Sequence, residues 1–125
     1  RRITPPSTRP LFVSLKISKA MSVIVTPENA QSLLEQDLPL VLDFSATWCG
    51  PCRKVSPIMD ELAEEFAGRV VVAKADVDEC EDLAIDFKVR NVPTILFIKD
   101  GKVVDKQTGA ASKNVFVEKI NALLG

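Results

Sequence analysis

Apolar residues follow two alternating patterns from residue 21 onward, one typical of strands and the other typical of helices. Nearly continuous apolar runs predict strands that are covered on both faces. Apolar residues spaced three or four positions apart predict helices that pack one side against such strands. The expected strands lie at 22–25, 40–46, 70–76, 94–98 and 102–106, and the expected helices at 26–34, 50–66, 81–87 and 112–124.

Capping and turn residues mark the ends of these elements. Thr26 and Ser112 are expected to cap the first and last helices, and Asp100-Gly101 is expected to form a tight hairpin turn. Pro57 lies inside the longest helix and should kink it. Strands that alternate with helices, followed by a hairpin and a last helix, predict an α/β sandwich with a mixed sheet.

The first twenty residues differ in composition from the remainder of the chain. Residues 1–20 contain five basic and no acidic residues, whereas residues 21–125 contain 11 basic and 17 acidic residues, a net charge of −6. We therefore expect one domain over 21–125 and a basic N-terminal extension over 1–20. The extension could be a cloning remnant, an upstream segment before a start at Met21, or an organellar presequence, although its prolines disfavour an amphipathic helix. Residues 11–17 alternate like a strand that could pack on a sheet edge or a second molecule.

Composition and charge exclude several classes of function. An acidic domain gives no reason to expect nucleic-acid binding, because phosphate contacts require clustered Lys and Arg. No apolar run approaches the roughly 20 residues of a membrane span. The chain has no His, which removes the commonest general base and the commonest metal ligand. We therefore expect no nucleic-acid, membrane or metal partner.

The chain has three cysteines, too few for a disulfide scaffold, and one of them must lack an internal partner. This favours a reducing compartment. Cys80 is expected to be a free surface thiol at the start of a helix, with a regulatory or dimerising role as the alternative. The acidic residues around it lack the glycine and the spacing of an EF-hand loop, so they are interpreted as a solvated surface.

The segment Trp48-Cys49-Gly50-Pro51-Cys52 lies where a buried strand is expected to end and a helix to begin. Two thiols three positions apart can close a small disulfide ring within the first helical turn. The free N–H groups and the positive dipole end of the helix favour a thiolate there. Cys49, at the exposed end, is therefore the expected low-pKa nucleophile, and Cys52 is the expected resolving thiol.

Two other interpretations of this cysteine pair are weaker. Half of a zinc site would need further Cys or His ligands, and only Cys80 remains. A purely structural disulfide would gain little, because the loop it closes is very short. The pair is therefore interpreted as redox-active.

Asp43 and Lys74 are charges inside strands that are otherwise apolar. Because a lone buried charge is costly, we expect the two side chains to face each other. Burial should raise the pKa of Asp43, and Lys74 should lower it. Our hypothesis is that Asp43 takes the proton from Cys52 when that thiol attacks the mixed disulfide, with Lys74 tuning Asp43. The alternative is a purely structural ion pair.

Residues 21–125 resemble the thioredoxin family over the length of that family's domain, and the pentapeptide that contains Cys49 and Cys52 is highly specific for it. The other matching stretches are Val41-Leu42-Asp43-Phe44, Pro57, Lys74, Val92-Pro93-Thr94, Asp100-Gly101 and Thr108-Gly109-Ala110.

This resemblance implies a fold and a substrate surface. The fold would be a five-stranded mixed sheet in the order 1-3-2-4-5, flanked by four helices. The Val92–Pro93 peptide bond would be cis and would lie beside the active-site disulfide, with the Val92 backbone pairing with the substrate chain. A flat apolar rim would surround it, formed by Trp48, Gly50, Pro51, Gly109 and Ala110.

The resemblance also implies a general protein disulfide reductase that acts through a mixed disulfide. No cofactor would bind this chain, and electrons would come from an external NADPH- or ferredoxin-dependent thioredoxin reductase. The partners would be that reductase and disulfide-containing proteins. The expected state is a monomer, with a weak dimer through the extension or Cys80 as the alternative. The expected compartment is the cytoplasm, or an organellar matrix or stroma if residues 1–20 are a presequence.

Two rival functions stay open at this point. A disulfide oxidase or isomerase is less favoured, because Gly50-Pro51 between the cysteines is typical of reductants in this superfamily. A redox-independent binding subunit would use the same fold to dock a partner, and its activity would survive loss of both cysteines.

Overall fold

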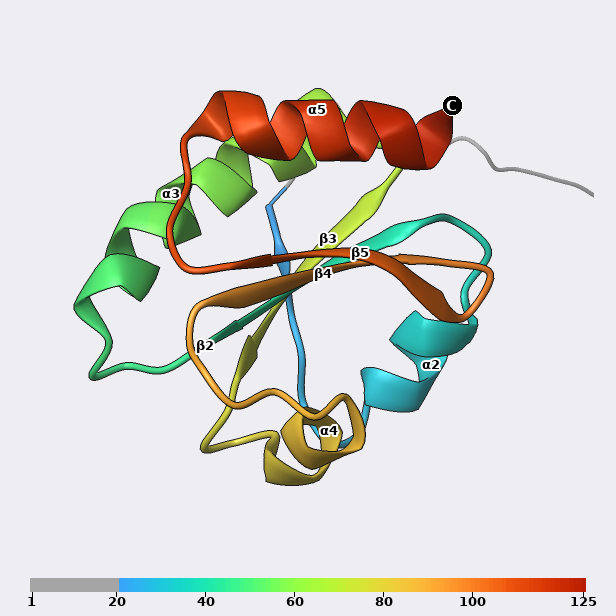
Figure 1. Cartoon of the computed structure of the whole chain (residues 1–125). Coiled ribbons are helices and arrows are strands. Elements are labelled where there is room, and N and C mark those ends of the chain that lie inside the picture. The colour runs from blue at the N-terminus through green and yellow to red at the C-terminus, as the bar shows by residue number, and fades with distance from the viewer. Residues whose placement is uncertain (1–20) are drawn as a thin grey trace, which may run out of the picture.

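Five strands form one sheet at the centre of the computed structural model, which describes residues 21–125 (Figure 1). The expected strand pattern at 11–17 lies outside the described residues. The strand order is β1-β3-β2-β4-β5, as the resemblance implied. The strands are β1 (Val23–Ile24), β2 (Leu40–Ser45), β3 (Val71–Asp76), β4 (Thr94–Lys99) and β5 (Lys102–Thr108).

The sheet is mixed, which confirms the predicted fold class. Strand β3 pairs in parallel with both β1 and β2, whereas β4 pairs antiparallel with both β2 and β5. The carboxyl ends of β2 and β3 therefore meet at one edge of the sheet. The hairpin between β4 and β5 turns at Asp100 and Gly101, whose φ angles of 54° and 78° suit the Asp-Gly pair predicted there.

Four helices cover the two faces of the sheet (Figure 1). Helices α3 and α5 lie on one face, and their apolar sides form a core with the side chains of Val41, Ile95 and Phe97. Helices α2 and α4 lie on the other face, over Leu42 and Phe44. The helices are α2 (Ala30–Glu35), α3 (Gly50–Glu65), α4 (Glu81–Asp86) and α5 (Lys113–Leu124).

The helix starts differ in detail from the predictions. Regular helix begins at Ala30 in α2, because Thr26 and Asn29 first form a turn in which each donates its backbone N–H to the other's side chain. This reciprocal arrangement is that of a capping box. Ser112 is the N-cap of α5, as predicted, but its side chain makes no capping hydrogen bond. Pro57 lies within α3, which is continuous from Gly50 to Glu65.

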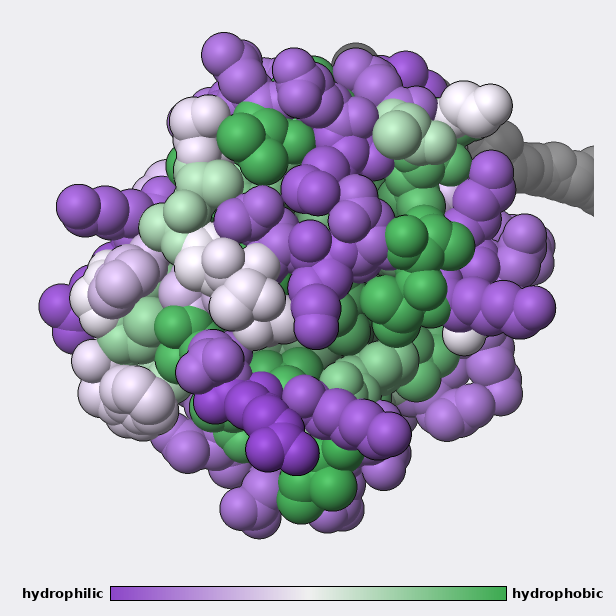
Figure 2. All heavy atoms as spheres, in the orientation of Figure 1, coloured by the Kyte–Doolittle hydropathy of each residue, from purple (hydrophilic) through white to green (hydrophobic). Residues whose placement is uncertain are grey.

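Polar residues cover most of the face shown in Figure 2, with smaller apolar areas between them. Among the described residues, five large apolar side chains are more than half exposed: Met21, Ile24, Trp48, Ile85 and Val104.

Candidate active site

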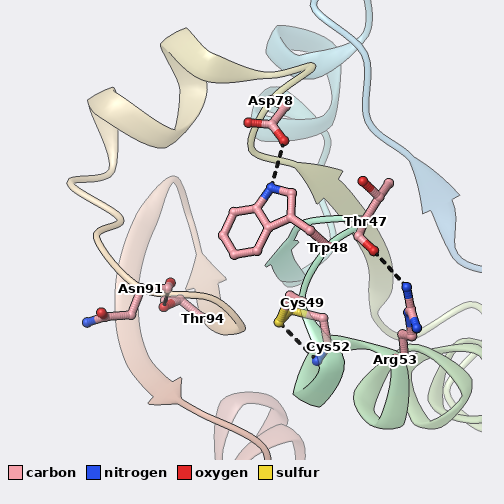
Figure 3. Close-up of a disulfide and its surroundings, with 8 residues drawn as sticks. All are labelled: Thr47, Trp48, Cys49, Cys52, Arg53, Asp78, Asn91 and Thr94. Carbon is pink, nitrogen blue, oxygen red and sulfur yellow. Dashed lines mark hydrogen bonds between the residues drawn. A yellow bond between two sulfur atoms is a disulfide. The ribbon is translucent and has the colours of Figure 1, made fainter.

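Cys49 and Cys52 form a disulfide at the point where the chain leaves the central strand β2 and enters helix α3 (Figure 3). Cys49 is the N-cap residue of α3, and its Cα lies 5.3 Å from that of Cys52. The backbone N–H of Cys52 donates a hydrogen bond to Cys49 Sγ over 3.2 Å. The start of the helix therefore points a donor at the sulfur of Cys49, as the sequence predicted.

Both cysteines are buried in this disulfide form. Cys49 is 5% exposed and Cys52 is 3% exposed, so the expected exposure of Cys49 is wrong for this state. The reason is local packing, because Ala46, Val77 and Val92 pack against the two residues. What distinguishes the cysteines is position, since Cys49 caps the helix and Cys52 lies within its first turn.

Trp48 lies beside the disulfide and is 68% exposed. Its indole Nε1–H donates a hydrogen bond to Asp78 Oδ2 over 3.1 Å (Figure 3). Asp78 follows β3, whose carboxyl end lies at the same sheet edge as that of β2. The hydrogen bond therefore joins the loops that follow the two strands and holds the indole ring at the surface.

The loop before β4 supplies the other side of the site. The Val92–Pro93 bond is cis, as the resemblance implied. Pro93 is buried, and its carbonyl accepts a hydrogen bond from the Gly109 N–H over 2.8 Å, which links this loop to the residues after β5. Gly109, with a φ of +89°, is half-buried and Ala110 is exposed.

A groove of about 390 Å³ lies between Trp48 and Val92. Its walls also include Val77 and Ala84, which are apolar, and Arg90. Gly50 and Pro51 are exposed at the start of α3. Among the predicted substrate-binding residues, Val92 packs against the cysteines and Trp48 lies beside them, and the role of the whole set in binding stays a prediction.

Asp43 and Lys74 are register partners on β2 and β3, but they do not form the predicted direct pair. Lys74 Nζ instead lies 2.9 Å from Asp60 Oδ1 and donates a hydrogen bond to Ser56 Oγ over 2.7 Å. Asp43 is 1% exposed, and its Oδ1 has no hydrogen-bond partner. The prediction failed because helix α3 offers the ammonium two partners closer to the surface.

Burial raises the pKa of Asp43 to about 7, and the nearby positive charge of Lys74 opposes this rise. Both directions agree with the sequence prediction. A carboxyl group with such a pKa can hold or release a proton near neutral pH, which is a requirement for general acid–base chemistry. The proton-transfer role itself stays a prediction.

Cys80 is the N-cap residue of α4, as predicted, but it is not a surface thiol. It is 4% exposed, and its Sγ–H donates a hydrogen bond to the Val25 carbonyl over 3.4 Å. Burial, reinforced by Asp76, Glu79 and Glu28, raises the pKa of Cys80 above its ordinary value. The structure therefore presents no exposed thiol for a dimer through Cys80.

Three residues near the site were missed by the sequence analysis: Ser56, Asp60 and Asp78. Asp78 could have been found, because it follows a strand parallel to the one that precedes Cys49. Ser56 and Asp60 are four positions apart and so lie on one side of α3. Because their partner Lys74 is on another element, no local pattern in the sequence pairs them with it.

Among residues 21–125, no group of three or more His, Cys, Asp or Glu side chains is arranged to hold a metal ion. Within the same range, no helix combines the length and apolar character needed to cross a membrane.

The model of the thioredoxin family matches residues 21–122 of this chain. The chain belongs to the thioredoxin family. It is 44% identical to thioredoxin C-2 of Corynebacterium nephridii over 96 residues, 76% of this chain and 89% of the relative. It is 46% identical to the thioredoxin of Haemophilus influenzae over 89 residues, 71% of this chain and 83% of the relative. It is 32% identical to the mitochondrial thioredoxin of Bos taurus over 123 residues, 98% of this chain and 74% of the relative.

Family membership and the cysteine pair together establish the type of chemistry. As a thioredoxin with a Cys49–Cys52 disulfide at the start of α3, the chain is an oxidoreductase that acts on protein disulfides.

Proposed function

We propose that this thioredoxin is a general protein disulfide reductase with Cys49 as nucleophile and Cys52 as resolving thiol. The observation that carries the proposal is the hydrogen bond from the Cys52 N–H to Cys49 Sγ. In the reduced protein, this donor and the positive end of a 16-residue helix favour a thiolate at Cys49.

The proposed reaction has two exchange steps. The Cys49 thiolate attacks one sulfur of the substrate disulfide, and the other substrate sulfur leaves as a thiolate. The Cys52 thiol then loses its proton and attacks Cys49 Sγ, which breaks the mixed disulfide and releases the second substrate sulfur. The substrate gains two electrons, and this chain is left with the Cys49–Cys52 disulfide.

We propose that Asp43 accepts the proton of Cys52 in the second step. A pKa of about 7 supports this role, because the carboxyl group can be ionised before the step and protonated after it at neutral pH. Lys74 tunes Asp43 by opposing the rise in its pKa.

The proposed substrate surface surrounds the disulfide. The Val92 backbone pairs with the extended substrate chain beside Pro93, in the manner of an added strand. The groove between Trp48 and Val92 supports this proposal, since it offers apolar area next to the cysteines. Four further residues complete the surface: Gly50, Pro51, Gly109 and Ala110.

The reduced form is regenerated by an external thioredoxin reductase, and this chain itself binds no cofactor.

We propose the cytoplasm as the compartment of the reductase reaction if residues 1–20 stay on the mature chain. The mitochondrial thioredoxins of Bos taurus and Rattus norvegicus each align over 98% of this chain, so these alignments extend into residues 1–20. That observation supports an organellar compartment if residues 1–20 are a presequence.

A trapping experiment tests the order of the two cysteines. The reduced Cys52→Ser variant is mixed with insulin, and non-reducing mass spectrometry is expected to find a stable mixed disulfide at Cys49, because no second thiol can resolve it. The Cys49→Ser variant is expected to trap less than about a hundredth as much, because Cys52 lies within the helix. Cys80→Ser serves as the matched control and is expected to turn over insulin like the wild type. Equal trapping by both variants, or full activity of the doubly substituted chain, contradicts the proposal.

A further inference from the structure

Four polar side chains from different parts of the chain meet next to Asp43, and we call them the Lys74 cluster: Ser22, Ser56, Asp60 and Lys74. Lys74 lies on β3, and Asp60 and Ser56 lie on α3. Lys74 Nζ contacts Asp60 Oδ1 at 2.9 Å and Ser56 Oγ at 2.7 Å. Ser22 Oγ–H donates a hydrogen bond to the same Asp60 oxygen over 2.8 Å. The ammonium group is therefore held from the side of α3.

The position of Lys74 in the sheet would also allow another pairing. Asp43 is its register partner on the adjacent strand, and side chains of register partners point to the same face of a sheet. Yet Asp43 Oδ1 is buried without a hydrogen-bond partner, while Lys74 Nζ is bound to α3. Among residues 21–125, Lys74 is the cation that acts on Asp43, so the cluster competes with Asp43 for its ammonium group.

Asp60 is suited to this competition because it keeps its charge. Burial works to raise the pKa of Asp60, but the hydrogen bonds from Lys74 and Ser22 outweigh burial and hold the pKa below its ordinary value. A carboxylate accepts a charge-assisted hydrogen bond from an ammonium group more strongly than a neutral group does. Asp60 therefore supplies the dominant attraction on Lys74 within the cluster.

We propose that Asp60 is a positioning residue that holds the Lys74 ammonium away from Asp43 and so lets Asp43 exchange a proton at neutral pH. The catalytic consequence rests on the proposed proton-transfer role of Asp43. The effect on Asp43 itself does not depend on that role.

The other groups that face Asp43 do not compete with this explanation. From β4, its register neighbour is Ile95, which is apolar and fully buried. On α3, Cys52 does not titrate while it is in the disulfide, and Asp60 is the residue whose effect is under test. From β3, the charged group that acts on Asp43 is Lys74.

The direct test is a titration of Asp43 by carboxyl-carbon NMR in the disulfide form, in which neither Cys49 nor Cys52 contributes. In the wild type, the midpoint is expected near pH 7. In Asp60→Ala, Lys74 is freed to approach Asp43, and the midpoint is expected to fall by about one pH unit. Asp60→Asn preserves the shape of the side chain and guards against a folding defect. It is expected to shift the midpoint in the same direction, by a smaller amount.

Glu61→Gln is the matched control. Glu61 is the next acidic residue on α3, but its partner is Lys113, 3.1 Å away, so the variant removes one charge from the helix without touching Lys74. The control is expected to leave the Asp43 midpoint unchanged. An unchanged midpoint in Asp60→Ala, or an equal shift in Glu61→Gln, overturns the proposal.

A second measurement separates the two proposals. Trp48 is the only tryptophan, so its fluorescence can follow the oxidation of the reduced protein by a model disulfide as a function of pH. If Asp43 accepts the Cys52 proton, the acid limb of the rate is expected to shift with the Asp43 midpoint in Asp60→Ala. If the midpoint shifts and the rate profile does not, the positioning role of Asp60 stands and the proton-transfer role of Asp43 is wrong.

Discussion

Cys49 and Cys80 occupy equivalent places in the fold but differ in chemistry. Each is the N-cap residue of a helix that follows one of two adjacent parallel strands, Cys49 after β2 and Cys80 after β3. Each is nearly buried, at 5% and 4% exposure. Neither a helix start nor burial can therefore explain why Cys49 belongs to the redox pair and Cys80 does not.

The difference lies in what each sulfur contacts. Cys49 Sγ accepts the N–H of Cys52, whereas Cys80 Sγ–H donates to the Val25 carbonyl and makes no capping hydrogen bond. A donor directed at sulfur favours the thiolate, and an acceptor favours the thiol. The nearby charges also favour a thiolate at Cys49 over one at Cys80, because the first turn of α3 has no acidic residue, whereas that of α4 has Glu81 and Asp82. A helix start thus activates a thiol only when its N–H groups face the sulfur and its neighbours are not acidic.

Alkylation of the reduced protein is the most direct test of the difference between Cys49 and Cys80. With iodoacetamide at pH 7, Cys49 is expected to react about a thousandfold faster than Cys80, because only Cys49 has its thiolate stabilised. Peptide mass spectrometry over a time course measures both rates in one sample. Rates within tenfold of each other would show that the contacts of the two sulfurs do not govern their reactivity.

The surroundings of Cys49 and Cys80 also differ in the burial of their carboxyl groups, since Asp43 is buried and Asp82 is exposed. The variant Asp43→Asn tests the effect of this burial. Because the pKa of Asp43 rises from 3.8 to about 7 on folding, its stabilising contribution is complete below pH 3.8 and is lost as pH rises through 7. Removing the ionisable group should therefore raise the unfolding free energy by about 4 kcal/mol at pH 8, relative to its effect at pH 3.5. Urea denaturation at the two pH values measures the change.

Asp82→Asn is the control for that stability measurement. Asp82 is exposed in the first turn of α4, near Cys80. The variant is expected to change the unfolding free energy by less than about 0.5 kcal/mol at pH 8, as surface substitutions usually do. If the effect of Asp43→Asn does not depend on pH, folding does not raise the pKa of Asp43.

The smallest expected effect concerns the acidic residues around Cys80. Glu79 is one of the charges that raise the pKa of Cys80, but burial is the larger cause. Glu79→Gln should therefore lower this pKa only slightly and speed the alkylation of Cys80 at pH 8 by about twofold. Glu118→Gln, an exposed position on α5 at the opposite face of the sheet, is the control and is expected to leave the rate unchanged. A much larger increase would mean that charge, and not burial, keeps Cys80 unreactive.

The sequence was sufficient for the order of elements and for the placement of the cysteine pair, because both depend on local patterns. Buried strands appear as continuous apolar runs, and the turn residues Asp100 and Gly101 adopt the φ angles that their types favour. The sheet order and the cis bond before Pro93 came from the family resemblance, since spacing alone does not specify which strands pair.

The predictions that failed depend on contacts between distant residues. Cys80 lies in an acidic segment that looks solvated, but its side chain turns inward to Val25, which is 55 residues away in the chain. Lys74 was assigned to Asp43 because both interrupt apolar strands, and Asp60 was not considered as a partner. Only the packing of α3 on the sheet shows that Asp60 is close enough to bind Lys74.

The place of β2 in the sheet has a consequence for repeated turnover. β2 is hydrogen bonded along both edges, to β3 on one side and β4 on the other, and it leads directly to Cys49. Amide hydrogens of such an innermost strand exchange with solvent only when the sheet opens. The sulfur chemistry is thus anchored to a strand whose amides are expected to exchange slowly, and each redox cycle can begin from the same geometry.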